Sequence, residues 1–191
     1  DVRRLDRLIS DISDASRLDA ELQRQDAIRV DLRRLLGTLV SVANETKLGH
    51  DVAVEARFEG RSPTDTFAVT GHDSRLGQVV SNLLSNAQSF SEAGSKVRLV
   101  CRRVRGEIEI VVDDDGPGIR DDALERIFER FYTDRPHQGF GQNSGLGLSI
   151  SKQIVDAHGG RIWAENRAGP ADEDGAPTVA GARFVVRLPA L

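Results

Sequence analysis

The segment that decides the fold reads Val111-Val112-Asp113-Asp114-Asp115-Gly116-Pro117-Gly118-Ile119, an apolar run that enters an acidic turn with two glycines. Glycine lets the backbone approach a flat ligand closely, and a fixed carboxylate can accept a hydrogen bond from the exocyclic amine of a purine. An ordinary Asp-Gly turn is the alternative. A turn does not need three acids and two spaced glycines, so both interpretations stay open at this point.

A pair of asparagines lies in the preceding predicted helix, within Asn82-Leu83-Leu84-Ser85-Asn86-Ala87. Residues four apart share one helix face, and the adjacent leucines indicate that this helix also contributes to the core. Carboxamide oxygens side by side suit a hard cation such as Mg²⁺. Taken alone, a solvated pair on the back of the helix explains them better.

Aromatic residues follow the acidic turn in Ile127-Phe128-Glu129-Arg130-Phe131-Tyr132. Aromatics at the end of a short helix, before a long loop, can anchor a flexible lid. They can equally belong to the core, and in isolation that interpretation is favoured.

A glycine-rich loop then feeds into a predicted helix, in Gly139-Phe140-Gly141-Gln142-Asn143-Ser144-Gly145-Leu146-Gly147-Leu148. Free N–H groups at a helix start, together with the helix dipole, suit phosphate. A serine-capped helix after a flexible loop is the alternative. Four glycines within residues 139–147 favour the phosphate interpretation.

Composition excludes several classes of protein. The 191 residues are 39% apolar and 29% charged, with a net charge of -4, which is typical of a globular protein and argues against a nucleic-acid module. One cysteine, Cys101, excludes an internal disulfide and is predicted to lie in the core. No apolar run reaches the roughly 20 residues of a membrane span, and Walker A, zinc-protease and serine-hydrolase motifs are absent. The chain starts at Asp, so a piece of a longer protein is expected.

Hydrophobic periodicity predicts an α+β fold. Strands occur in adjacent pairs, which favours a two-layer sandwich of a mixed sheet covered by helices on one face, preceded by an amphipathic helix that stands apart. Helices are predicted at residues 1–25, 32–43 (ended near Gly49), 73–87 (capped by Asp73), 121–131 and 145–158. Strands are predicted at residues 51–59 with 67–70 as a hairpin mate, 97–104 with 107–113, 161–165 and 183–188, and residues 169–181 are interpreted as a mobile linker.

In this order the four elements resemble the N, G1, F and G2 boxes of the histidine kinase catalytic domain, in the superfamily that includes Hsp90, DNA gyrase and MutL. His158-Gly159-Gly160-Arg161-Ile162 and the last predicted strand look like that family's closing strands. The resemblance implies the Bergerat ATP-binding fold over residues 26–191. Residues 1–25 look like the second helix of the dimerisation and phosphotransfer hairpin.

The resemblance also implies roles for individual residues. Asp114 is expected to bind the adenine amino group in a pocket shaped by Gly116 and Gly118, and Asn86, with Asn82 nearby, to bind Mg²⁺. The implied nucleotide-binding residues are Asn82, Asn86, Phe90, Asp114, Gly116, Gly118, Ile119, Arg130, Tyr132, Gly145, Leu146, Gly147 and Leu148, under a lid at about residues 133–144.

Two departures concern the phosphate groups. Ser89 stands where the family usually has a phosphate-binding lysine, and Thr133 stands where a basic residue is common. The negative charge of the phosphates must then be neutralised by Mg²⁺, by backbone amides and by Arg130 or Arg135. These variations, with Tyr132-Thr133-Asp134-Arg135-Pro136, resemble the alphaproteobacterial envelope-stress kinases of the ChvG type.

The family's acceptor histidine, which is followed by an acid and a proline, has no counterpart among His50, His72, His137 and His158. Each of these is predicted to be a surface or structural residue, and the chain alone is not expected to phosphorylate itself. The resemblance implies a protein-histidine kinase that is homodimeric in its parent. It would serve a response regulator receiver domain, from the cytoplasmic side of an inner-membrane sensor whose membrane contact lies in other segments. A superfamily ATPase that acts as a conformational switch, and a non-catalytic nucleotide-binding dimer scaffold, remain the alternatives.

Overall fold

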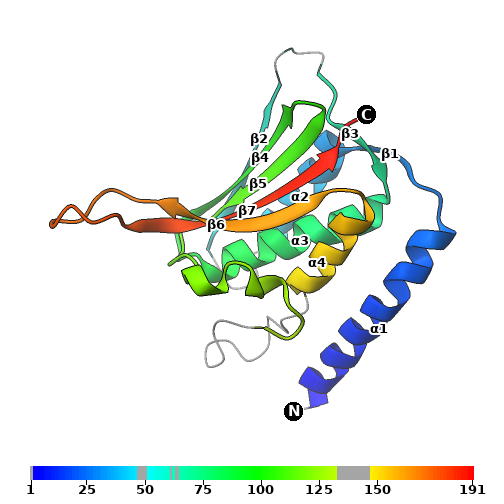
Figure 1. Cartoon of the computed structure of the whole chain (residues 1–191), viewed down its shortest axis with the longest axis horizontal. Helices are drawn as coiled ribbons and strands as arrows, with labels where there is room; N and C mark the ends of the chain where they lie inside the picture. The colour runs from blue at the N-terminus through cyan, green and yellow to red at the C-terminus, as the bar shows by residue number, and fades with distance from the viewer. Residues whose placement is uncertain (1, 47–50, 61, 63–64, 133–146) are drawn as a thin grey trace.

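The computed structural model describes residues 2–46, 51–60, 62, 65–132 and 147–191 (Figure 1). Its elements are α1 (Val2–Arg24), β1 (Ile28–Asp31), α2 (Leu32–Thr46), β2 (Ala53–Glu59), β3 (Ala68–Gly71), α3 (Asp73–Phe90), β4 (Lys96–Val104), β5 (Glu107–Asp113), the 3₁₀ turns η1 (Asp121–Ala123) and η2 (Arg126–Phe128), α4 (Gly147–Ala157), β6 (Arg161–Ala168) and β7 (Val179–Pro189). None of the helices in these ranges is long and apolar enough to cross a bilayer.

The main sheet has five strands in the order β2-β4-β5-β7-β6. β2 pairs with β4 in parallel and the other neighbours pair antiparallel, so the predicted mixed sheet is confirmed. Helices α2, α3 and α4 lie along one side of the sheet (Figure 1). The predicted α+β sandwich is therefore confirmed as well.

Strand alternation separates the two faces of the sheet. On β4 the buried side chains Val97, Leu99 and Cys101 face the helices, with the inward residues of β5 beside them. Burial raises the pKa of the Cys101 thiol to about 12, which keeps it protonated as a core residue. The predicted core position of this cysteine is thus confirmed.

The hairpin predicted between residues 51–59 and 67–70 is wrong. β3 pairs antiparallel with β1, a strand that the sequence analysis missed, in a separate two-stranded sheet. β2 pairs instead with β4, because α3 provides the long crossover that a parallel pair requires.

Two further predictions need correction. Residues 121–131 do not form one helix: they contain only η1 and η2, and the chain becomes extended at Glu129, directly after η2. Helix α3 begins at Asp73 and its cap residue is His72, not Asp73. Gly49, the predicted end of the second helix, lies outside the described residues.

The segment interpreted as a mobile linker is largely a β-hairpin arm. β6 continues to Ala168 and β7 begins at Val179, so the two strands extend beyond the predicted ends. At the tip, the Asp172 Oδ1 atom accepts hydrogen bonds from the backbone N–H groups of Asp174 and Ala176. The arm projects from one end of the sheet (Figure 1).

Helix α1 contacts the rest of the protein mainly through its C-terminal half, and Leu8 in the N-terminal half also packs against the hydrophobic core. Leu18 is fully buried, Glu21 forms an ion pair with Arg75 of α3, and Asp19 accepts a hydrogen bond from Gln153 of α4 at 3.0 Å. Nearer the N-terminus, Leu5, Ile9 and Ile12 remain more than half exposed. The predicted apolar stripe is therefore half covered and half open.

Candidate functional site

The Asp114 carboxylate lies directly after β5 and is 2% exposed. Its Oδ1 atom accepts hydrogen bonds from the N–H groups of Gly116, at 2.8 Å, and Ala182, at 3.1 Å. Within the described part of the chain both bonds use Oδ1. That arrangement leaves Oδ2 to accept a hydrogen bond from a ligand.

Burial raises the pKa of Asp114 above its ordinary value, because removal from water disfavours the charged form. The hydrogen bonds from Ala182 and Gly116 and the charge of Arg167 oppose this rise. A buried carboxylate held by backbone donors is a strong acceptor for a ligand amine.

Two glycines of the turn permit close packing that a side chain would block. A Cβ added to Gly116 would lie 2.7 Å from the Phe90 carbonyl oxygen at the end of α3. Gly118 has a φ of 79°, and a Cβ there would lie 2.8 Å from Oδ1 of Asn166. The functional interpretation of Gly116 and Gly118 therefore has a steric basis.

Asn166 of β6 holds the far side of the same turn. Its Oδ1 accepts the N–H of Ile119 at 2.8 Å, and its Nδ2 donates to the Ile119 carbonyl at 2.6 Å. This residue is not among those predicted from the sequence. A carboxamide at an inward-facing strand position is a usable signal, because a buried amide requires partners.

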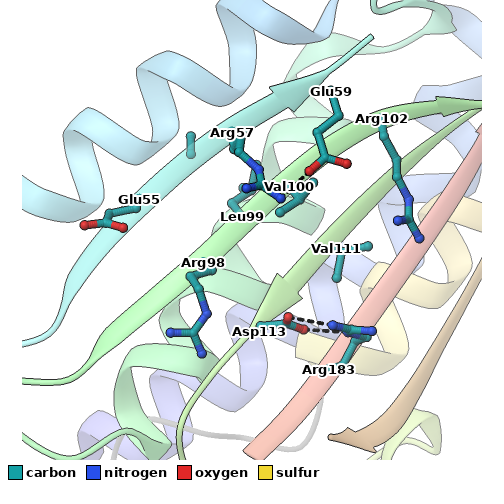
Figure 2. A pocket seen from close by; sticks show the side chains of 11 residues that line it. Glu55, Arg57, Glu59, Arg98, Leu99, Val100, Arg102, Val111, Asp113 and Arg183 are labelled. Carbon is teal, nitrogen blue, oxygen red and sulfur yellow. Dashed lines mark hydrogen bonds and ion pairs between the residues drawn. The ribbon is translucent and has the colours of Figure 1, made fainter. Parts of the chain in front are cut away.

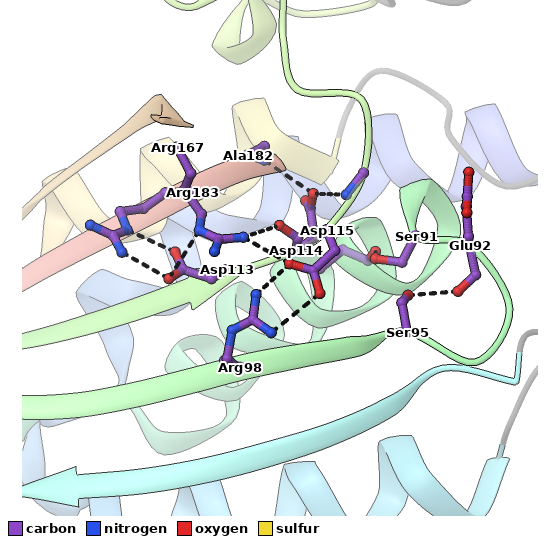
Figure 3. Close-up of polar contacts among 12 residues, drawn as sticks. Ser91, Glu92, Ser95, Arg98, Asp113, Asp114, Asp115, Arg167, Ala182 and Arg183 are labelled. Atoms are coloured by element: carbon purple, nitrogen blue, oxygen red, sulfur yellow. Dashed lines mark hydrogen bonds and ion pairs between the residues drawn. The ribbon is translucent and has the colours of Figure 1, made fainter. Parts of the chain in front are cut away.

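The two acids that flank Asp114 are paired with arginines from three strands (Figure 3). Asp113 receives a bidentate pair from Arg183 of β7, at 2.7 and 2.8 Å, and Asp115 receives one from Arg98 of β4. Arg167 of β6 adds a bond to Asp115 at 2.9 Å. The three arginines, also missed from sequence, explain why the turn tolerates three acids.

The asparagine pair lies on α3, where both side chains are half-buried. Asn82 Nδ2 donates to the Gly147 carbonyl at 3.1 Å and to Ser151 Oγ at 3.2 Å, which joins α3 to the start of α4. Since its amide nitrogen is used in this way, the Asn82 oxygen remains as an acceptor or metal ligand. One turn later, the Asn86 side chain follows on the same face.

The remaining predicted residues surround this centre. Ile119, Tyr132 and Leu148 pack against the hydrophobic core, Phe90 at the end of α3 is half-buried, and Arg130 is exposed. Gly147 begins α4 next to Asn82. Gly145, Leu146 and the predicted lid lie outside the described residues.

A shallow pocket on the opposite face of the sheet does not coincide with this site (Figure 2). It is lined mainly by charged side chains that alternate in sign across neighbouring strands, among them Glu55, Arg57, Arg98, Arg102 and Arg183. Three of its lining residues connect it with the acidic turn: Asp113, its ion-pair partner Arg183, and Arg98, which pairs with Asp115.

Residues 71–191 match the family model described as histidine kinase-, DNA gyrase B-, and HSP90-like ATPase. The chain belongs to this family. Because the matched region includes the asparagine pair, the acidic turn and the start of α4, the predicted resemblance is confirmed.

Named relatives of this ATPase domain are sensor kinases. The sensor protein ChvG of Rhizobium meliloti is 52% identical over 195 residues, which cover the whole of this chain and 33% of that protein. The chain thus spans about a third of the length of this relative.

Solved structures agree with the fold. The mycobacterial sensor histidine kinase MprB is 27% identical with a TM-score of 0.68, over 85% of this chain and 97% of that one. Full-length ShkA, solved in complex with AMPPNP, is 27% identical with a TM-score of 0.74, over 98% of this chain and 36% of that one.

Two of the four histidines connect the start of α3 with the end of α4 in this ATPase domain. The N–H of His72 donates to Nε2 of His158 at 3.1 Å, and Nδ1 of His158 lies 2.7 Å from the Ile154 carbonyl oxygen. Burial lowers the pKa of His158, so this ring favours its neutral form. Both act as structural residues here, while His50 and His137 lie outside the described residues.

Proposed function

We propose that the chain is the ATP-binding catalytic core of a sensor histidine kinase, which transfers the γ-phosphate of ATP to a histidine on another segment. The observation that supports this most is the buried Asp114 carboxylate, with Oδ1 held by two backbone N–H groups and Oδ2 left for a ligand. An adenine amino group is the donor that suits such an acceptor. Ile119 and Phe90 supply apolar surface for the base.

At the other end of the nucleotide, we place the phosphates between α3 and the start of α4. Asn86 and Asn82 offer amide oxygens to Mg²⁺ that arrives with ATP, which fits the oxygen preference of that ion. The metal would neutralise charge on the phosphates during transfer. The first N–H groups of α4, at Gly147 and Leu148, add hydrogen-bond donors.

The acceptor and the partners follow from the family. None of the four histidines has the expected acceptor context, so we place the acceptor on a segment outside these 191 residues. The open half of the α1 stripe, including Leu5 and Ile12, suits a helical dimer bundle in the parent protein. We place this domain on the cytoplasmic side of an inner-membrane sensor, from which a response regulator aspartate receives the phosphoryl group.

The decisive test is Asp114→Asn. Asparagine keeps an oxygen that can accept hydrogen bonds from the N–H groups of Gly116 and Ala182, but its amide NH₂ would set a donor against the ligand amine. We expect calorimetric titration with ADP·Mg²⁺ to show binding by the unchanged chain. We expect an affinity at least about 100-fold lower for the variant, since the wrong partner leaves buried donors unpaired. Circular dichroism checks that both proteins are folded.

The rival functions give different results. A chain that binds no ADP·Mg²⁺ at millimolar concentration would be a scaffold, and the kinase proposal would be lost. For the longer protein, labelled ATP should yield acid-labile phosphohistidine that Asp114→Asn abolishes. Steady ATP hydrolysis without phosphohistidine would instead identify a conformational ATPase.

A further inference from the structure

Arg167 occupies a special position among the three arginines at the acidic turn (Figure 3). Its Nη1 donates to the Asp114 carbonyl oxygen at 2.7 Å and to Asp115 Oδ1 at 2.9 Å, and its Nε lies 3.6 Å from Asp113 Oδ2. One guanidinium therefore touches all three consecutive acidic residues. Arg98 and Arg183 each form a salt bridge with a single aspartate of this turn.

The backbone of β7 leaves room for this contact. Arg167 is in register with Gly181, which has a φ of 151°. A Cβ on Gly181 would overlap the Asp114 carbonyl oxygen and lie 3.2 Å from Nη1 of Arg167. Only a glycine lets the turn and the arginine meet at this point.

The side chain is well placed for a strong interaction. Arg167 is 22% exposed, whereas most arginines on the same sheet face are more open. Its charge is shielded from water on one side, and a guanidinium fork can hold a carbonyl and a carboxylate at the same time. Removal of the guanidinium would leave the negative charges of the Asp113 and Asp115 carboxylates less well neutralised.

We propose that Arg167 is a positioning residue for the base of the bound nucleotide: it fixes the Asp114 main chain and cancels the negative charge of Asp113 and Asp115 around the Asp114 carboxylate. This rests on the proposed nucleotide binding at Asp114. Arg167 does not touch the ligand. Its effect passes through the orientation of the turn and the local charge.

The test compares Arg167→Gln with the unchanged chain by titration with ADP·Mg²⁺ and with adenosine. We expect both ligands to bind about tenfold more weakly to the variant, because a charge-assisted hydrogen bond to the turn is lost. Arg161→Gln is the matched control. Arg161 lies on the same strand and pairs with Glu107 at 3.2 Å, away from the turn, so its affinity should equal that of the unchanged chain.

A second variant separates charge from simple structural support. In Arg167→Gln combined with Asp115→Asn, the carboxylate that Arg167 compensates is also removed. We expect part of the lost affinity to return, because the charge balance is restored while the hydrogen bond to the Asp114 carbonyl stays lost. If Arg167→Gln does not fold by circular dichroism, Arg167→Lys, which keeps the charge, takes its place and should lose only about threefold, since the fork is lost.

The outcomes are distinct. Equal affinities of Arg167→Gln and the unchanged chain would overturn the positioning role, while binding itself remained. A loss without recovery in the double variant would overturn the charge-cancelling part. If the unchanged chain bound neither ligand, the proposed function and this inference would fail together.

Discussion

The two ends of the proposed nucleotide site are built in different ways. At the base end, Asp114 is fixed by backbone bonds from Gly116 and Ala182, and the turn is held from β6 by Asn166 and Arg167. Its contacts come from segments more than 40 residues apart in sequence. The base end is therefore assembled by tertiary structure.

At the phosphate end, the described residues offer few fixed contacts. Asn82 joins α3 to Gly147, and Ser89 Oγ donates only to the Asn86 carbonyl of its own helix, at 2.8 Å. Ser89 provides no positive charge where the family usually has a lysine. In the proposed site, the base would therefore meet a turn held by several side chains and backbone groups, whereas the phosphates would depend on the metal and on helix N–H groups.

The largest expected effect breaks the base end through Gly181→Ala. The added Cβ would overlap the Asp114 carbonyl oxygen, which is backbone and cannot move aside cheaply. We expect the free energy of unfolding to fall by about 3 kcal/mol or more, as in severe overpacking. Urea denaturation measures the stability, and adenosine titration measures any binding that survives.

Gly175→Ala is the control for this change. Gly175 lies at the tip of the β6–β7 arm with a φ of 80°, and apart from its two chain neighbours no described residue lies within 4 Å of an added Cβ. We expect a loss of about 1 kcal/mol, which is the cost of the left-handed conformation alone. A loss at Gly181 no greater than that at Gly175 would contradict the steric account of the turn.

The predictability of the site from sequence follows the same division. Asp114 with its glycines, and Asn82 with Asn86, are predicted as site residues because their signals are local: a turn pattern and a helix spacing. Asn166, Arg167 and Gly181 lie in or beside residues that were interpreted as a linker. Nothing local to these residues indicates that β6 folds back onto a turn nearly 50 positions earlier.

The fold shows the same limit. The hairpin at Arg105 and Gly106 was predicted correctly, since both residues adopt positive φ in a tight turn. The partner of β3 was wrong, because sequence proximity favoured the preceding strand. Its true partner β1 is only four residues long and lies before α2, so neither its length nor its position reveals the pairing.

A moderate effect is expected when charge is restored at the phosphate end with Ser89→Lys. A lysine there would lie one turn from Asn86 and could meet a phosphate. We expect ATP·Mg²⁺ to bind about fivefold more tightly at low salt, through roughly 1 kcal/mol of attraction, with no change for adenosine. The gain should shrink as salt increases.

The control for this variant is Thr38→Lys on α2. Thr38 is exposed, and its hydroxyl donates to the Arg34 carbonyl oxygen of its own helix at 3.1 Å. Like Ser89→Lys, this change therefore adds one positive charge and removes one hydrogen bond within a helix. Thr38→Lys should leave ATP affinity unchanged. Equal gains for both variants would show a general charge effect and would remove the distinction between the two ends.

The smallest effect is a pH dependence confined to the base end. The ionised Oδ2 of Asp114 accepts hydrogen bonds only, whereas protonation there would set an O–H donor against the ligand amine. We therefore expect adenosine affinity to be complete above the pKa of this carboxyl and to fall as pH falls through it. An ordinary aspartate has a pKa of about 4. Because burial raises the pKa of Asp114, the loss of adenosine affinity should begin at a higher pH than such an aspartate would give. Adenosine lacks phosphates that titrate, and the protonation of its own ring nitrogen N1 is measured separately in the free ligand and subtracted. Arg167→Gln removes a charge that lowers the same pKa, so its profile should move to higher pH. A profile that is the same in both proteins would place the electrostatic control of Asp114 elsewhere than in Arg167.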